Sequence, residues 1–322
     1  MPAPIAGIFF VNETPLGCTT VLEAKAVVLF LFYVFHFSMS VSFPVHFNLL
    51  FTIRASLPGI LKENPSILEN AMEKKTRLLP YCYALATIAC TFFVGRLLLW
   101  LAPDNTSPWA SPLFILMNLL PMLLAFAFLR VSGEKASLWQ CLKGAFSPRE
   151  AWPAWAAAVA VPAVYYGVSA LLGNVTVTGA PASAVLAYFP WTLLQGGLEE
   201  VGWRWYLQER LPVPKNSVGK LLVLSGIWFV WHFPIYAIPW ITAGSSNYFL
   251  FYLMILGNTF TLGAVKTLSR GALPCILAHM LIDTMAVAML VGSDVGKIAA
   301  LAAVEILLSL LVLALHRRRA AA

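Results

Sequence analysis

Residues 109–129 read WASPLFILMNLLPMLLAFAFL, an apolar run without any Asp, Glu, Lys or Arg. Such a run is long enough for a helix that crosses a lipid bilayer, which needs about 17–25 mostly apolar residues. Further apolar runs lie on both sides of it, at 26–47, 81–101, 151–172, 183–208, 221–240, 248–265, 272–291 and 298–315. The runs are continuous and do not alternate as barrel strands would. The sequence therefore predicts an all-α, polytopic transmembrane helical bundle of about eight to nine spans.

The composition favours the same fold class. Hydrophobic residues make up 60% of the chain and charged residues only 11%, and the mean hydropathy is +0.80. Because a soluble domain carries about 25% charged residues, this composition excludes an ordinary water-soluble fold. The five cysteines have no CxxC pair and no metal-ligand spacing. They are typical of packing residues and not of a disulfide framework or a zinc site.

Basic residues concentrate in alternate connections between the apolar runs. Lys74, Lys143, Lys215 and Lys266 lie in such connections, and the tail ends with three arginines at 317–319. The intervening connections at 102–108, 173–182 and 241–247 hold none. Lys25, Arg96 and Lys297 are the exceptions on that side, each near the end of a span, where a long side chain can reach the membrane surface. Cytoplasmic loops carry the excess of Lys and Arg. With nine spans we expect an integral protein of a prokaryotic cell membrane, with the N-terminus outside and the C-terminus in the cytoplasm.

The net charge of +7 is then a topology signal and an attraction to anionic lipid. A nucleic-acid partner is excluded, because the sequence shows no basic folded face.

Ionisable residues inside the apolar runs gather in the second half of the chain. They are Glu199, Glu200 and Arg204 in 183–208, His232 in 221–240, and His279 and Asp283 in 272–291. Charge inside a membrane is costly, so these residues are functional candidates. With a rise of 1.5 Å per residue, Glu199, His232, His279 and Asp283 all lie about 12–18 Å from the cytoplasmic ends of their helices. We therefore expect them to meet at one depth.

The spacing inside each helix predicts two pairs. Glu200 and Arg204 are four residues apart and are expected to form an ion pair on one helix face. Glu199 lies about 100° round the helix and is left out of that pair. His279 and Asp283 are also four apart, so the carboxylate is expected to accept an imidazole N–H and fix the tautomer of the ring. An unpaired carboxylate beside histidines is the arrangement that activates water by general-base catalysis.

These motifs, taken in order, resemble the CPBP family. They are EExxxR at 199–204, an aromatic residue four positions before His232, HxxxD at 279–283, and the approach to the last motif at 263–274. The family comprises the type II CAAX prenyl endopeptidases and bacterial bacteriocin-processing or self-immunity relatives. The resemblance covers 183–286 and implies an intramembrane glutamic endopeptidase without cofactor or metal. Its implied partners are a membrane-bound or prenylated-like polypeptide substrate and the lipid bilayer.

The resemblance also implies a role for each candidate residue. Glu199 with His232 would activate the water, His279 with Asp283 would stabilise the oxyanion, and Glu200 with Arg204 would support the first helix. The chain departs from the family at Trp228, where Phe is usual, and we expect this change to alter only packing. It departs again at Asp283, where the prenyl endopeptidases have Asn. An ionised Asp cannot donate to an oxyanion, so Asp283 is either protonated or orients His279.

We expect one integral membrane domain with three parts. Residues 1–182 form N-terminal helices and loops, 183–292 form the catalytic core, and 293–322 form a terminal helix and basic tail. Two other functions stay open. One is a zinc-dependent intramembrane metalloprotease, although no HExxH occurs. The other is a catalytically inactive immunity or scaffolding membrane protein. The sequence fixes neither the substrate nor the oligomeric state.

Overall fold

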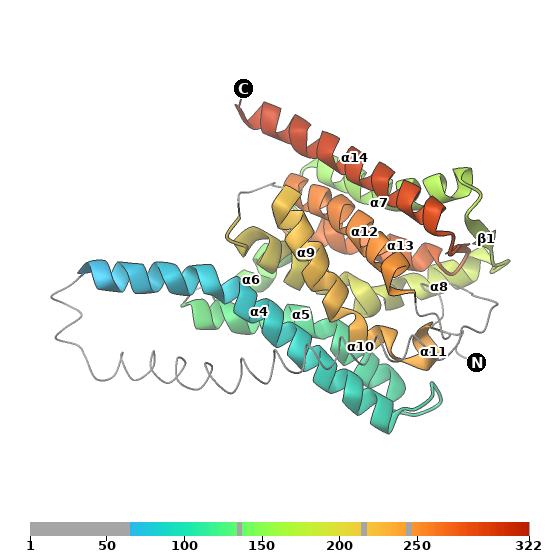
Figure 1. Ribbon diagram of the computed structural model, residues 1–322, viewed down its shortest axis with the longest axis horizontal. Coiled ribbons are helices and arrows are strands. Elements are labelled where there is room, and N and C mark those ends of the chain that lie inside the picture. Colours follow the sequence, from blue (N-terminus) through green and yellow to red (C-terminus); the bar gives the residue numbers. More distant parts are fainter. Residues whose placement is uncertain (1–64, 134–136, 214–217, 243–246, 322) are drawn as a thin grey trace. The chain divides into compact units, whose positions relative to one another are not determined.

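The computed structural model describes residues 65–133, 137–213, 218–242 and 247–321 (Figure 1). The predicted span at 26–47 lies outside these residues. Among these residues, those from Leu78 onward form one compact unit, and those before Leu78 belong to a second unit. The second unit contributes only the start of helix α4 to the described residues. That start includes Lys74, which was expected in a loop and lies in the helix.

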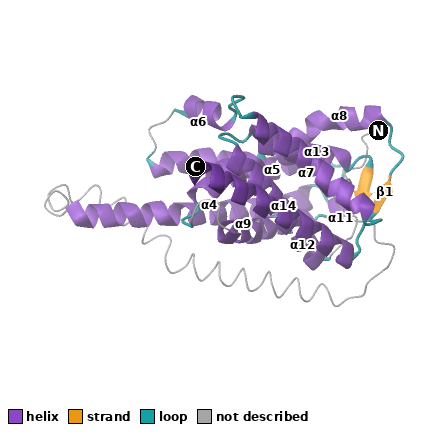
Figure 2. Cartoon of the chain, turned by 90° about the horizontal axis from the view of Figure 1, so that it is seen from above, coloured by secondary structure: helices purple, strands orange, loops and turns teal. Residues whose placement is uncertain are grey.

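The described residues are predominantly helical (Figure 2). The α-helices are α4 (Pro65–Leu101), α5 (Ala110–Ser132), α6 (Leu138–Ala145), α7 (Trp152–Leu171), α8 (Ala182–Thr192), α9 (Val218–Trp231), α10 (Phe233–Tyr236), α11 (Pro239–Thr242), α12 (Tyr248–Leu268), α13 (Leu273–Met285) and α14 (Val295–Ala321). Two π-helical segments, η1 (Leu193–Gly197) and η2 (Val201–Gln208), follow α8.

Six helical segments in the described part of the chain are long and apolar enough to cross a membrane. They are Thr76–Leu101, Ala110–Ser132, Trp152–Leu171, Val218–Tyr236, Tyr248–Leu268 and Val295–Arg319. Each overlaps a run predicted from the sequence, so the prediction of an all-α, polytopic membrane protein is confirmed. The chain is an integral membrane protein.

Two predicted spans have a different form in the structure. The run at 183–208 is not one regular helix but α8 followed by η1 and η2. The run at 272–291 is helical only as far as Met285, where α13 ends, and strand β2 (Met289–Val291) follows. This strand pairs antiparallel with β1 (Val175–Val177), with Val175 opposite Val291. Apolar composition alone predicted a span at 272–291, whereas pairing with the distant β1 decides its last three residues.

Helix α12 lies inside the bundle. It packs against α14, α9, α7 and α13, and 67% of its apolar window is buried, compared with 33–44% for the other five segments. Against α14, Gly257 lies where any side chain would meet the carboxylate of Glu305. Gly263 approaches α9 at Leu221 in the same way. Small residues on one helix thus allow close contact between helices, as is usual in membranes.

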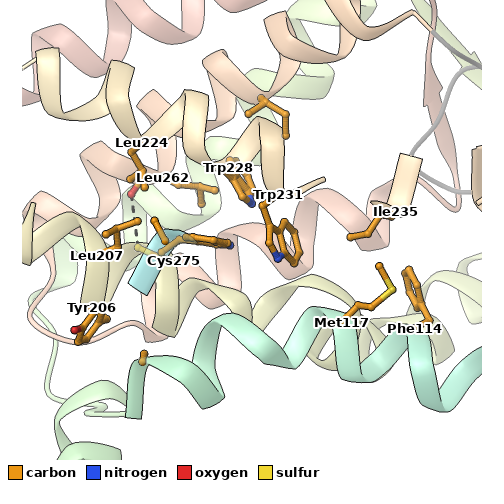
Figure 3. Packing of buried hydrophobic residues seen from close by; sticks show 14 of the residues in the cluster. Phe114, Met117, Tyr206, Leu207, Leu224, Trp228, Trp231, Ile235, Leu262 and Cys275 are labelled. Carbon is orange, nitrogen blue, oxygen red and sulfur yellow. Dashed lines mark hydrogen bonds between the residues drawn. The ribbon is translucent and has the colours of Figure 1, made fainter. Parts of the chain in front are cut away.

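The main hydrophobic core takes residues from α4, α5, α9, α12, α13 and η2. Figure 3 labels members of this core from α5, η2, α9, α12 and α13. Aromatic rings dominate it: the centroids of Tyr83 and Tyr206 are 4.6 Å apart and those of Trp203 and Trp231 are 5.5 Å apart. Trp231 satisfies its indole N–H by donating to Oγ1 of Thr91 at 2.7 Å. This core fixes η2 and α9 relative to each other, and both carry residues of the candidate site.

Candidate active site

Three elements bring the candidate residues together. Glu199 and Glu200 lie between η1 and η2, Trp228 lies on α9 (Figure 3), and His279 and Asp283 lie on α13. The π form begins where the amide of Leu198 donates to the carbonyl of Leu193, five residues earlier, at 3.0 Å. Wider turns of this kind occur often at functional sites, because they shift side chains away from the regular helical positions.

The two carboxylate oxygens of Glu199 have different surroundings. Oε2 accepts hydrogen bonds from the indole Nε1 of Trp203 at 3.0 Å and of Trp228 at 3.1 Å. Oε1 faces Nε2 of His279 at 3.6 Å. The side chain is almost fully buried. Two fixed donors thus hold Oε2. Oε1 faces the histidine and can accept a proton there.

Glu200 links two groups from different elements. Its Oε2 accepts from Nε of Arg204 at 2.8 Å, which confirms the predicted ion pair. Its Oε1 lies 2.7 Å from Nδ1 of His279. Arg204 also donates to the carbonyl of Thr259 at 3.3 Å and stacks over the ring of Trp228 at 5.0 Å. Glu200 and Arg204 are both fully buried, so each compensates the charge of the other.

The tautomer of His279 is set by Glu200 and not by Asp283. The predicted hydrogen bond within α13 is wrong, because Nε2 of His279 lies 3.8 Å from Oδ1 of Asp283. The i,i+4 spacing permits that contact, but the 2.7 Å contact with Glu200 orients the ring. Glu200, as the ionised partner of Arg204, can only accept, so Nδ1 carries a proton. Nε2 is therefore the nitrogen that faces both Glu199 and Asp283.

Asp283 is buried against the backbone of η1. A Cβ atom on Gly196 would lie 2.7 Å from Oδ2 of Asp283 and 2.8 Å from Nε2 of His279. One on Gly197 would lie 2.9 Å from Cγ of Met280. In the described part of the chain, Oδ2 of Asp283 has no hydrogen-bond partner. Only glycines at 196 and 197 allow η1 to approach α13 this closely.

His232 packs against Trp228. Its Nδ1 is 2.8 Å from the carbonyl of Trp228, which can only accept, so Nδ1 donates and Nε2 keeps a lone pair. The ring packs edge-on against Trp228 at 5.3 Å and Trp231 at 4.6 Å. Among the described residues no hydrogen bond or ion pair joins His232 to Glu199. Trp228 contacts His279 as well, at 5.8 Å, and therefore packs against both histidines.

Some residues of the site were missed in the sequence. Trp228 does more than pack, as its indole holds Glu199, so the expectation of a packing change alone is wrong. Trp203 follows Glu199 by four residues, as Arg204 follows Glu200. That spacing could have predicted the contact between Trp203 and Glu199. The Gly-Gly pair at 196–197 lies just before the acidic motif, and it was a second signal in the sequence for a residue of the site. Among the described residues, no three His, Cys, Asp or Glu side chains are grouped to hold a metal ion.

Comparison with known families identifies the segment that holds this site. Residues 181–285 match the family model described as type II CAAX prenyl endopeptidase Rce1-like, about a third of the chain. No curated protein matches the sequence. The resemblance found in the three motifs is confirmed, since this segment is similar to the CAAX protease family. The segment contains Glu199, Glu200, Arg204, His232, His279 and Asp283.

Proposed function

We propose that the chain is an intramembrane endopeptidase that hydrolyses a peptide bond of a membrane-associated, prenylated-like polypeptide, with Glu199 as the general base. The observation that carries the proposal is that the two carboxylate oxygens of Glu199 have different surroundings. Two indole N–H groups hold one oxygen, and the other faces His279 at 3.6 Å in a buried site. The family match over 181–285 supports the same chemistry.

In the proposed reaction a water molecule attacks the carbonyl carbon of the peptide bond. Glu199 takes the proton of the water through Oε1 while the new C–O bond forms and the carbonyl electrons move to oxygen. The same proton then passes to the amide nitrogen as the C–N bond breaks, which leaves a carboxylic acid and an amine. Positioned general-base catalysis of this kind contributes about 10²–10⁴ in rate.

The other site residues assist this step. His232 keeps a lone pair on Nε2 and, in the proposal, accepts a hydrogen bond from the same water, beside the ring of Trp228. His279, oriented by Glu200, donates from Nε2 to the oxyanion when its ring is protonated. Asp283, 3.8 Å from that nitrogen, is its counter-charge. Glu200 and Arg204 are positioning residues, since they act through His279 and Trp228.

The location and the division of the chain are part of the proposal. We place the protein in a prokaryotic cell membrane, with the C-terminal arginines in the cytoplasm and the site open to the cytoplasmic leaflet. The catalytic core at 183–292 would then be held by the helices before it and by the terminal helix at 293–322.

A single substitution tests the assignment of the base. Glu199→Gln keeps the shape and both indole contacts but cannot take a proton, so cleavage should fall by a factor of at least about 10². The purified protein is assayed in liposomes with a fluorogenic farnesylated peptide that ends in a CAAX sequence. Glu209→Gln, at a half-exposed carboxylate, is the matched control. Near-normal cleavage by Glu199→Gln would refute the role. No cleavage by the wild type would favour the inactive immunity or scaffold function.

A further inference from the structure

Gln195 has a fixed orientation beside the site. It lies in η1, is only 5% exposed, and its Oε1 accepts a hydrogen bond from the hydroxyl of Tyr188 on α8. Because the carbonyl oxygen of the amide is bound to Tyr188, the NH₂ group is the end of the amide that is left for another acceptor. Within the part of the chain that the structure describes, no residue accepts from this nitrogen. Gln195 therefore presents two unused N–H donors from a nearly buried position.

The position of Gln195 places it next to the catalytic groups. It precedes Glu199 by four residues, about one turn of an α- or π-helix, so both side chains lie on roughly the same face. The next residue, Gly196, lies so close to His279 and Asp283 that a Cβ atom on it would meet both side chains. One turn earlier, Oγ1 of Thr192 lies 3.2 Å from Oγ1 of Thr284, the residue after Asp283. This side of η1 therefore packs along the turn of α13 that carries Asp283.

Peptide hydrolysis needs donors where negative charge develops on the carbonyl oxygen. Glu199, Glu200 and Asp283 can only accept while they are ionised. His279 can donate from Nε2 only while its ring is protonated, since Nδ1 is bound to Glu200. Gln195 differs from all of these residues. Its amide is neutral and donates whatever the protonation state of its neighbours.

We propose that Gln195 is a further catalytic residue, which donates an amide N–H to the carbonyl oxygen of the scissile bond and to the oxyanion that follows. Tyr188 is a positioning residue that holds the amide in the productive orientation through Oε1. The inference rests on the proposed peptidase function and extends it by one donor. A donor of this kind contributes about 10²–10³ to kcat.

The test compares Gln195→Leu, Gln195→Glu and Tyr188→Phe in liposomes with the farnesylated CAAX peptide. Both Gln195 variants keep the size of the side chain but lose the N–H donors, so kcat should fall about 10²–10³-fold with KM almost unchanged. Tyr188→Phe keeps the ring and frees the amide to turn, so kcat should fall on the order of tenfold, again with KM unchanged. Gln140→Glu, on the exposed face of α6, is the matched control.

The outcomes separate this inference from the function on which it rests. Wild-type kcat in both Gln195 variants, together with an inactive Glu199→Gln, would overturn the inference and leave the peptidase function intact. A rise in KM at constant kcat, or a parallel loss of thermal stability, would also overturn it, because the residue would then bind substrate or support the fold. Equal background rates for wild type and Glu199→Gln would overturn both proposals.

Discussion

Replacing Glu200 by Gln tests how the site is held together. In the wild type one oxygen accepts from Arg204 at 2.8 Å and the other contacts His279 at 2.7 Å. Gln offers a single carbonyl oxygen, so it can satisfy only one of the two donors, and its NH₂ group must face the other. Arg204 has little compensation elsewhere. Its bond to Thr259 is 3.3 Å long, and its Nη2 has no partner in the described part of the chain.

The expected effect is large because both partners are fully buried. Removing one partner of a buried ion pair destabilises a protein by about 3–5 kcal/mol. That is a substantial part of a total stability of about 5–15 kcal/mol. Denaturant unfolding in mixed micelles, followed by tryptophan fluorescence, measures the difference between the variant and the wild type.

A matched control lies on the following turns of the same segment. Glu209 pairs with Lys266 at 3.4 Å, but its side chain is 40% exposed. Glu209→Gln should therefore cost only about 0–1 kcal/mol. The double variant Glu200→Gln/Arg204→Met no longer contains the uncompensated charge of Arg204. The losses of stability of the two single variants should therefore not add, and the coupling energy should be about 0.5–3 kcal/mol. Equal, small losses for Glu200→Gln and Glu209→Gln would refute the argument.

Three other predictions follow. Gly196→Ala places a Cβ 2.7 Å from Oδ2 of Asp283, so kcat/KM should fall at least about tenfold, while Gly226→Ala, with open space around it, stays active. In a cysteine-free background, an impermeant thiol reagent should modify Asn105→Cys but not Lys143→Cys, and the reverse pattern would invert the topology. Dialysis against a chelator should leave cleavage unchanged; loss of activity that zinc restores would instead establish the metalloprotease alternative.

The sequence by itself determined the class of protein and the segment that carries the family motifs. Long apolar runs such as 109–129 must become helices in a membrane, because a bilayer satisfies no backbone hydrogen bonds. The Glu200–Arg204 pair was also predictable, as residues four apart on a helix are neighbours whatever the rest of the fold does. The motifs around Glu199, His232 and His279 were sufficient to indicate the family of the segment.

Only the tertiary structure decided which partners these residues take. His279 is held by Glu200, 79 residues earlier, and not by its helical neighbour Asp283. Trp228 reaches Glu199 from another helix, and the last three residues of the predicted span at 272–291 form a strand, because β1 lies beside them. The physical reason is common to all three. Spacing within a helix fixes only which contacts are possible, and the packing of distant segments, here through Gly196 and the aromatic core, selects those that form.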